Sequence, residues 1–371
     1  MHCRIKGLAH QVIRAASAHA IALIVSVGWF SLSASAAHAA SCTGDALVNV
    51  TLPSGAQWEL CWELRDEEGV VIKEAAYKTP QGSFRNVLKE ASLAQINVAY
   101  DDGTPSQRHV TDIANGGGLG LNIHSLSPLD CIDGSLHASA GNTVLCVKTK
   151  PRGYAYKSYA LLQQGHMLVL ESRATVGLSS YIIHWRLYDD GSIEPSVGLT
   201  GLLPKIGSDP NYGWPLDQNN RVGVAFNTSY FWRLDFDLAA DGSNESIEEF
   251  EVLSSADRRT KSLSVTTLSS ETSRSVAPDV KRSWRIRDVG TGVTNAEGRS
   301  ISYHLSPMHT AHRYTGAATE SWAQDDIYFT RYNACERFIV DNPTNGGCAD
   351  NVSGFINGES IDDEDVVLSL I

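Results

Sequence analysis

Residues 173–203 decide the fold, and they read RATVGLSSYIIHWRLYDDGSIEPSVGLTGLL. Apolar and β-branched residues alternate with polar ones on both sides of the DDGS segment at residues 189–192. Such alternation is typical of strands with one buried face, and an Asp-Gly pair favours a tight hairpin turn. The stretch therefore predicts two antiparallel strands joined by this turn.

The chain before this hairpin has the same short-strand pattern. Turn signals rich in Pro, Gly and Glu fall at residues 53–55, 67–69 and 79–82. Few segments show a helical period, so we predict an all-β fold, one large antiparallel β-sandwich. Its first buried face would come from Trp58, Trp62, Val70, Ile72 and Tyr77.

Residues 1–39 have the three parts of an export signal. A basic start is followed by an apolar core at residues 20–30 and by the small-x-small sequence Ala37-His38-Ala39. No later stretch approaches the ~18 apolar residues of a membrane span. We therefore predict a mature domain of residues 40–371 without a membrane span, exported to the periplasm or the extracellular space. The net charge of −12 argues against a nucleic-acid partner.

Six cysteines remain after the predicted signal is removed. An even number in an exported chain favours disulfides over metal thiolates, and no Cys-x-x-Cys spacing occurs. Six cysteines allow about fifteen connectivities, so pairing between sequence neighbours is a hypothesis. The hypothesis pairs Cys42 with Cys61, Cys131 with Cys146, and Cys335 with Cys348.

The central hairpin also resembles the cofactor segment of the copper amine oxidases, quinone-dependent enzymes that oxidise primary amines. The matching residues are Thr175, Tyr181, Trp185, Tyr188, Asp190, Gly191, Thr200, Gly201 and Leu202. The family's central Tyr, which becomes the quinone, is replaced by Ser179. The resemblance runs from about Trp58 to Leu368, implies the family's sandwich fold and a homodimer, and supports the Cys131–Cys146 pair.

The copper ligands of the family are also replaced. In the family a His-x-His pair ends five residues before an Arg-Leu-Asp-x-Asp strand, which here begins at Arg233. Counting back places Phe226 and Thr228 at the two histidine positions, and the third histidine would fall beyond Ile371. Phe has no donor atom and Thr is a poor substitute for imidazole. Copper and quinone are therefore not expected.

Two other candidate sites come with a simpler alternative. The resemblance offers Asp112 as the general base that removes a substrate proton, although the alignment needs an insertion. The alternative is a turn Asp before the Gly-rich bend at residues 116–120. His309 and His312 could share a metal on a helix, but their surroundings favour a loop. His184 lies on the opposite strand face from Tyr181 and is expected to pack across strands.

A calcium site is the one functional feature of the family that the sequence retains. The resemblance assigns it to the carboxylates of Asp235, Asp237 and Asp365 and the carbonyls of Phe236 and Val366. Hard oxygen ligands of this kind suit Ca²⁺. The alternative is a set of acidic strand residues that face solvent. The Ser/Glu/Thr-rich residues 243–281 have little pattern and are predicted to be exposed.

These observations favour an exported, catalytically degenerate relative of the copper amine oxidases that acts as a binding or structural subunit. We expect it to form a homodimer or to bind a protein partner. The alternative is an active primary-amine oxidase with a displaced site, for example one that uses Tyr181. A hydrolase that uses Ser179 or Ser180 is disfavoured because neither lies in a Gly-x-Ser-x-Gly elbow.

Overall fold

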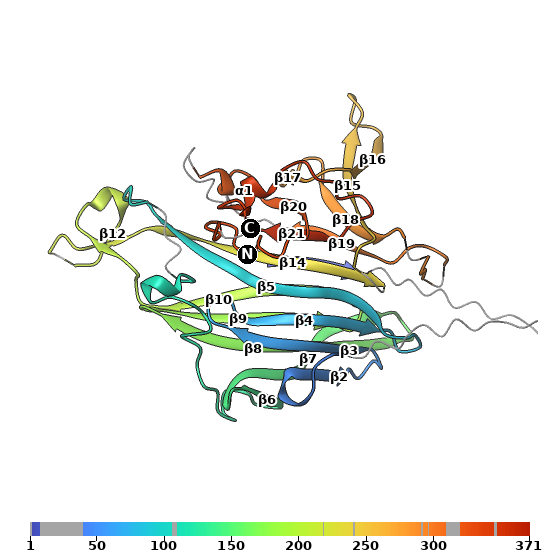
Figure 1. Ribbon diagram of the computed structural model, residues 1–371, viewed down its shortest axis with the longest axis horizontal. Coiled ribbons are helices and arrows are strands. Elements are labelled where there is room, and N and C mark those ends of the chain that lie inside the picture. Colours follow the sequence, from blue (N-terminus) through green and yellow to red (C-terminus); the bar gives the residue numbers. More distant parts are fainter. Residues whose placement is uncertain are drawn as a thin grey trace, which may run out of the picture.

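The computed structural model describes residues 2–7, 40–105, 110–217, 219–239, 242–290, 292–295, 297–308, 320–344 and 347–371. The described residues form two large antiparallel sheets and one small one (Figure 1). The predicted all-β sandwich is therefore confirmed. Helical turns are short: η1 (Gly44–Ala46), η2 (Ile113–Asn115), η3 (Pro210–Tyr212), η4 (Ser321–Ala323) and α1 (Val352–Phe355).

The first sheet contains the central hairpin. Its strands lie in the order β16 (Lys261–Leu268), β15 (Glu245–Ser254), β18 (Ser283–Asp288), β19 (Ser302–Met308), β1 (His2–Gly7), β10 (Ile193–Gly201), β9 (Ser179–Tyr188), β8 (Leu162–Val176), β7 (Asn142–Lys157) and β6 (Gly134–Ser139). Strands β9 and β10 pair in register from Leu187↔Ile193 to Ser179↔Gly201. The hairpin predicted with its turn at residues 189–192 is therefore confirmed.

The second sheet carries the long strands that face this hairpin. Its order is β17 (Thr272–Arg274), β20 (Ile327–Arg331), β21 (Val366–Leu370), β14 (Phe226–Ala239), β5 (Arg85–Tyr100), β4 (Gly69–Lys78), β3 (Gln57–Arg65) and β2 (Leu47–Thr51). A small third sheet, β11 (Ile206–Gly207), β13 (Val222–Val224) and β12 (Gly213–Pro215), projects at the left of Figure 1.

Aromatic residues join the two large sheets into one core. Trp185 of β9 packs edge-on against Trp232 of β14, with ring centroids 5.0 Å apart. The indole N–H of Trp58 donates to the Tyr188 carbonyl at 2.9 Å, so even the polar atom of this buried ring is satisfied across the interface. Of the five residues predicted for the first buried face, Trp58, Trp62, Val70 and Ile72 are buried and Tyr77 is half-buried.

The cysteine pairing follows the prediction. Disulfides join Cys42 to Cys61, Cys131 to Cys146 and Cys335 to Cys348. The first links the segment before β2 to β3, and the second links the segment before β6 to β7. These two disulfides therefore fix a loop to a neighbouring strand, whereas the third joins two loop residues between β20 and α1, and all three close a short loop of the unfolded chain.

The prediction for residues 243–281 is partly wrong. Strand β16 is mostly exposed, as expected, but β15 lies inside the sheet between β16 and β18. Residues 245–248 at its start are buried. The strand pattern could not be recognised in the sequence because acidic residues occupy positions inside the sheet. They are accommodated by ion pairs, Glu248 with Arg285 and Glu249 with Arg274.

Candidate functional site

A small cavity lies where β9 begins and β14 begins. Its volume is about 140 Å³. The two strands belong to the two large sheets: β14 places Thr228 beside Val98 of β5 on one side, and β9 places Tyr181 beside Leu199 of β10 on the other. The lining residues are Val98, Val176, Gly177, Leu178, Ser179, Tyr181, Leu199, Pro204, Phe226 and Thr228.

The cavity brings together the positions that the sequence analysis compared with the quinone Tyr and two copper histidines. Ser179, Phe226 and Thr228 all line it, although 47 residues separate the first two in the sequence. None of its described lining residues is His, Cys, Asp or Glu. The donors present are hydroxyl groups, which do not fit a copper ion that prefers imidazole nitrogen.

The phenols around this cavity hold their protons. Burial raises the pKa of Tyr181 well above its ordinary value, and the neighbouring Tyr230 and Tyr100 add to the shift. Burial likewise raises the pKa of Tyr230 to about 12. At neutral pH these groups are therefore hydrogen-bond donors and not phenolates.

Asp112 occupies the position expected of a turn residue. It is the N-cap of η2, where its carboxylate accepts from the Ala114 N–H at 3.0 Å and from the Asn115 amide at 2.6 Å. It does not line the small cavity. The geometry thus favours the turn interpretation of Asp112 over that of a general base.

His184 behaves as predicted. Strand β9 alternates between buried and half-buried residues, which places Tyr181 in the core and His184 on the other face. The imidazole Nε2 lies 3.3 Å from Glu171, its cross-strand partner on β8. His309 and His312 lie outside the described residues.

The acidic residues of the predicted calcium site gather between β14, β15 and the start of β21. Asp235 is 1% exposed, and among the described residues neither of its carboxylate oxygens has a hydrogen-bond partner. Its nearest cation is Arg233, whose Nη1 lies 4.0 Å away. Burial raises the pKa of Asp235 to about 7, with the Arg233 charge opposing the shift and the Asp365 charge adding to it.

Glu245, which the sequence analysis did not single out, lies in the same group. It is fully buried at the start of β15, where Oε1 accepts from the Leu238 N–H at 2.8 Å. Within the described part of the chain Oε2 has no hydrogen-bond partner. Burial raises the pKa of Glu245 to about 8; the Leu238 N–H opposes the shift, and the charges of Asp237 and Asp365 add to it.

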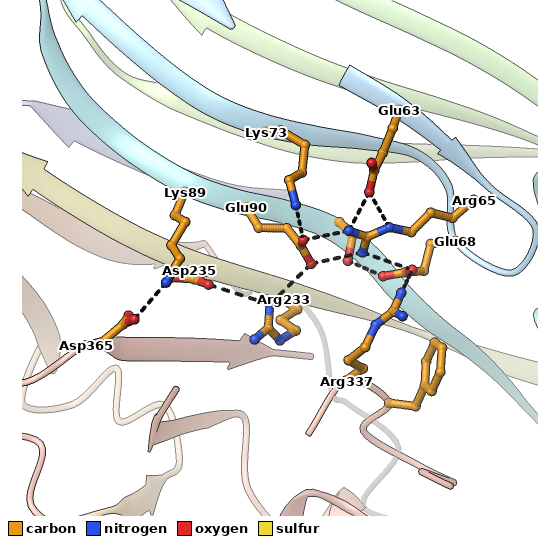
Figure 2. A network of polar contacts seen from close by, with 12 residues as sticks. Glu63, Arg65, Glu68, Lys73, Lys89, Glu90, Arg233, Asp235, Arg337 and Asp365 are labelled. Carbon is orange, nitrogen blue, oxygen red and sulfur yellow. Dashed lines mark hydrogen bonds and ion pairs between the residues drawn. The ribbon is translucent and has the colours of Figure 1, made fainter. Parts of the chain in front are cut away.

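A network of ion pairs borders this group (Figure 2). Glu90 is its centre and accepts from Arg65 at 2.6 Å and from Lys73 at 2.9 Å, with Arg233 at 3.4 Å. Lys89 Nζ pairs with Asp365 at 2.9 Å. The residues labelled in Figure 2 comprise equal numbers of basic and acidic side chains, so Asp237 and Glu245 are acidic groups beyond that balance.

The carboxylates are not arranged as a finished metal site. No three or more His, Cys, Asp or Glu side chains converge as metal ligands in the described ranges. Buried carboxylate oxygens without hydrogen bonds are nevertheless costly, because they have lost water without gaining a partner. Asp235, Glu245 and Asp365 each contribute such an oxygen, and oxygen ligands of this kind fit Ca²⁺.

A larger cavity, about 800 Å³, lies at the opposite end of β9 from Ser179. Tyr77, Asp190, Gly191 and Tyr303 line it together with Arg85 at the start of β5. Both phenol groups donate to backbone carbonyls, Tyr77 to Asp189 and Tyr303 to Gly191. Sequence reasoning did not find this cavity, because its walls come from segments more than 200 residues apart.

The fold and the small cavity together define the class of protein. The sequence model of the copper amine oxidase enzyme domain matches residues 54–370, so the chain belongs to the copper amine oxidase family. A primary amine oxidase of Arthrobacter sp. (strain P1) is 27% identical over 242 residues, which cover 55% of this chain and 37% of that protein. A primary amine oxidase of Pisum sativum is 25% identical over 318 residues, 76% of this chain and 46% of that protein.

Solved structures support the same fold. A copper-containing benzylamine oxidase from Hansenula polymorpha superposes with a TM-score of 0.66 at 18% identity, covering 88% of this chain and 56% of that one. This chain therefore spans about half the length of the relatives it matches. None of the helices in the described ranges has the length and apolar character needed to cross a membrane.

Proposed function

We propose that this protein is an exported, catalytically degenerate member of the copper amine oxidase family that acts as a binding or structural subunit. The observation that supports the proposal is the small cavity. Ser179, Phe226 and Thr228 meet there, at the positions where the resemblance places a quinone-forming Tyr and two copper-binding His. A Ser has no ring to oxidise, and Phe cannot hold a metal.

The size of the cavity supports the same proposal. At about 140 Å³ it is smaller than the roughly 300–1,000 Å³ of ordinary ligand pockets. The described lining residues offer hydroxyl groups and apolar surface but no charged side chain. A binding role is therefore expected to use another surface of the domain.

Calcium is the metal that we propose for this chain. Asp235, Asp237 and Asp365, with the carbonyls of Phe236 and Val366, would hold it. The buried oxygens of Asp235, which have no hydrogen-bond partner in the described part of the chain, support this assignment. A cation there would join β14 to β21, so its role would be to stabilise the second sheet.

We also propose a homodimer and export. The three disulfides are typical of a chain that folds in an oxidising compartment. The hairpin of β7 and β8 ends in exposed aromatic residues, which favours a partner surface.

A displaced amine oxidase site is the second candidate. Tyr181 supports it, because its phenol lines the same cavity as Thr228 and would be the ring oxidised in place of the missing Tyr. The absence of imidazole among the described lining residues weighs against this candidate.

The deciding experiment measures bound metals by mass spectrometry on protein purified from its export compartment, with quinone staining of the same sample. The Arthrobacter primary amine oxidase serves as the positive control. We expect calcium, with neither copper nor quinone. Stoichiometric copper or a quinone signal would overturn the degenerate assignment, and Tyr181→Phe would then show whether Tyr181 carries the signal.

A further inference from the structure

Lys89 of β5 reaches into the proposed calcium site. Its Nζ lies 2.9 Å from Oδ2 of Asp365, and the neighbouring carboxylate of Asp235 adds to the attraction. Asp235 and Asp365 come from β14 and from the residue before β21, so the ammonium lies where the two distant parts of the calcium site meet (Figure 2).

The ammonium satisfies only part of this site. Oδ1 of Asp365, Oε2 of Glu245 and both oxygens of Asp235 have no hydrogen-bond partner among the described residues. Lys89 carries one positive charge and donates to only one of these three acidic side chains. A divalent cation would bind the oxygens that Lys89 leaves without a partner, and would hold all three side chains as carboxylates by displacing their protons.

Lys89 can also leave Asp365 at little cost. Its side chain is 43% exposed, so the ammonium can turn into water. The ring of Tyr332 lies 4.1 Å from Nζ and offers a cation–π contact that does not depend on Asp365. A lysine that is flexible, partly exposed and held by a second contact is suited to exchange with a metal ion.

We propose that the Lys89 ammonium competes with calcium for Asp365 and thereby sets the calcium affinity of this site. Glu245 is a further carboxylate that attracts the ion. The inference rests on the calcium site proposed above. When the cation binds, the Lys89 ammonium releases Asp365 and remains beside Tyr332. The bound cation holds Glu245 as a carboxylate, and Oε2, which has no hydrogen-bond partner among the described residues, serves as a further ligand.

The test is calcium titration of the full chain by isothermal calorimetry after treatment with chelator. Lys89→Met is expected to tighten calcium binding about tenfold or more, since it removes a positive charge close to the ion. Glu245→Gln is expected to weaken binding by a similar factor. The rise in Tm on adding calcium should be larger for Lys89→Met than for the unchanged chain, and smaller for Glu245→Gln.

Lys73→Met is the matched control. It removes an ammonium of the same network that pairs with Glu90 instead of Asp365, and should change calcium affinity less than threefold. Lys89→Gln gives a second, polar variant if Lys89→Met does not fold. Calcium binding that neither Lys89 variant tightens would overturn the role of Lys89 alone. If neither the unchanged chain nor the variants bind calcium, the calcium site is wrong and this inference falls with it.

Discussion

At the scale of single residues, the small cavity holds three side chains whose positions were found by resemblance to the copper amine oxidases. Resemblance placed Ser179, Phe226 and Thr228 at three functional positions, and the structure brings the three together. Lys89 and Glu245 could not be found in the same way. Neither belongs to a motif of the family resemblance. The pairing of β14 with β5 and β21 brings Lys89 close to Asp235 and Asp365, and the backbone contact of Glu245 with Glu364 brings Glu245 close to Asp365.

Glu90 provides the clearest pH dependence. Burial alone would raise its pKa, but hydrogen bonds from Arg65 and Lys73 lower the pKa to about 2. A depressed pKa stabilises the fold above the unfolded value of 4.5, and this contribution is lost as pH falls toward 2. We expect Glu90→Gln to lower the free energy of unfolding by about 3 kcal/mol at pH 7. Urea unfolding of the unchanged chain and of Glu90→Gln, at pH 7 and at pH 3, measures this loss of free energy and its dependence on pH.

The difference between Glu90→Gln and the unchanged chain should shrink to roughly half or less at pH 3. Glu63→Gln is the control, because Glu63 also pairs with Arg65 but is 46% exposed. Its effect should stay within about 0.5 kcal/mol, as for other exposed ion pairs. Equal effects of the two variants, or an effect of Glu90→Gln that does not change with pH, would contradict this account of the network.

At the scale of elements, a strand could be predicted from the sequence where its buried residues are apolar, and could not where they are polar. The β9–β10 hairpin was predictable because its core residues are apolar and its turn is Asp-Gly. Strand β15 could not be predicted, because Glu245, Ser246 and Glu248 are buried near its start. Polar residues at buried positions remove the alternation of apolar and polar residues that marks a strand. The acids are tolerated there because arginines of β18 pair with Glu248 and the backbone of Leu238 pairs with Glu245.

Strand β1 gives a prediction about export. The backbone of His2–Gly7 lies between β19 and β10 in the first sheet, inside the segment that we predict to be a cleaved signal. Cleavage after Ala39 would remove the strand that joins the two halves of this sheet. We therefore expect β19 amides to exchange with deuterium faster in the mature chain than in the full chain, by about tenfold or more.

Hydrogen exchange followed by mass spectrometry compares the two chains, with the β9 strand as internal control, since its partners β8 and β10 remain. Equal protection of β19 in both chains would mean that another segment fills the place of β1. A mature protein that still begins with His2–Gly7 would instead contradict the export signal.

At the scale of the whole molecule, the sequence was sufficient for the fold. Six cysteines, an apolar strand pattern and ordered motifs predicted a disulfide-linked β-sandwich, and the two large sheets confirm it. The surface through which the chain would bind a partner could not be predicted from the residues alone, because the sequence does not show which apolar side chains are exposed and which are buried. The structure distinguishes them, and the clearest exposed group is the tip of the β7–β8 hairpin.

The proposed homodimer can be tested at this tip. Tyr154, Tyr156 and Tyr159 are 59, 52 and 109% exposed, and Leu161 and Leu162 beside them are each more than half exposed. Aromatic residues in such a group are typical of contact surfaces, where each can contribute ~1–2 kcal/mol. We expect replacement of the three Tyr by Ser to weaken dimerisation at least about tenfold, as measured by analytical ultracentrifugation.

Leu129→Ser is the control for this experiment, because Leu129 is 85% exposed but lies outside the β7–β8 hairpin. It should leave the dimer unchanged, and both variants should keep the β-rich circular dichroism spectrum of the unchanged chain, since none of the replaced side chains belongs to the core. A dimer that survives the triple replacement would place the contact on another face. A chain that is monomeric before any replacement would remove the homodimer and leave these tyrosines as a surface for a different protein.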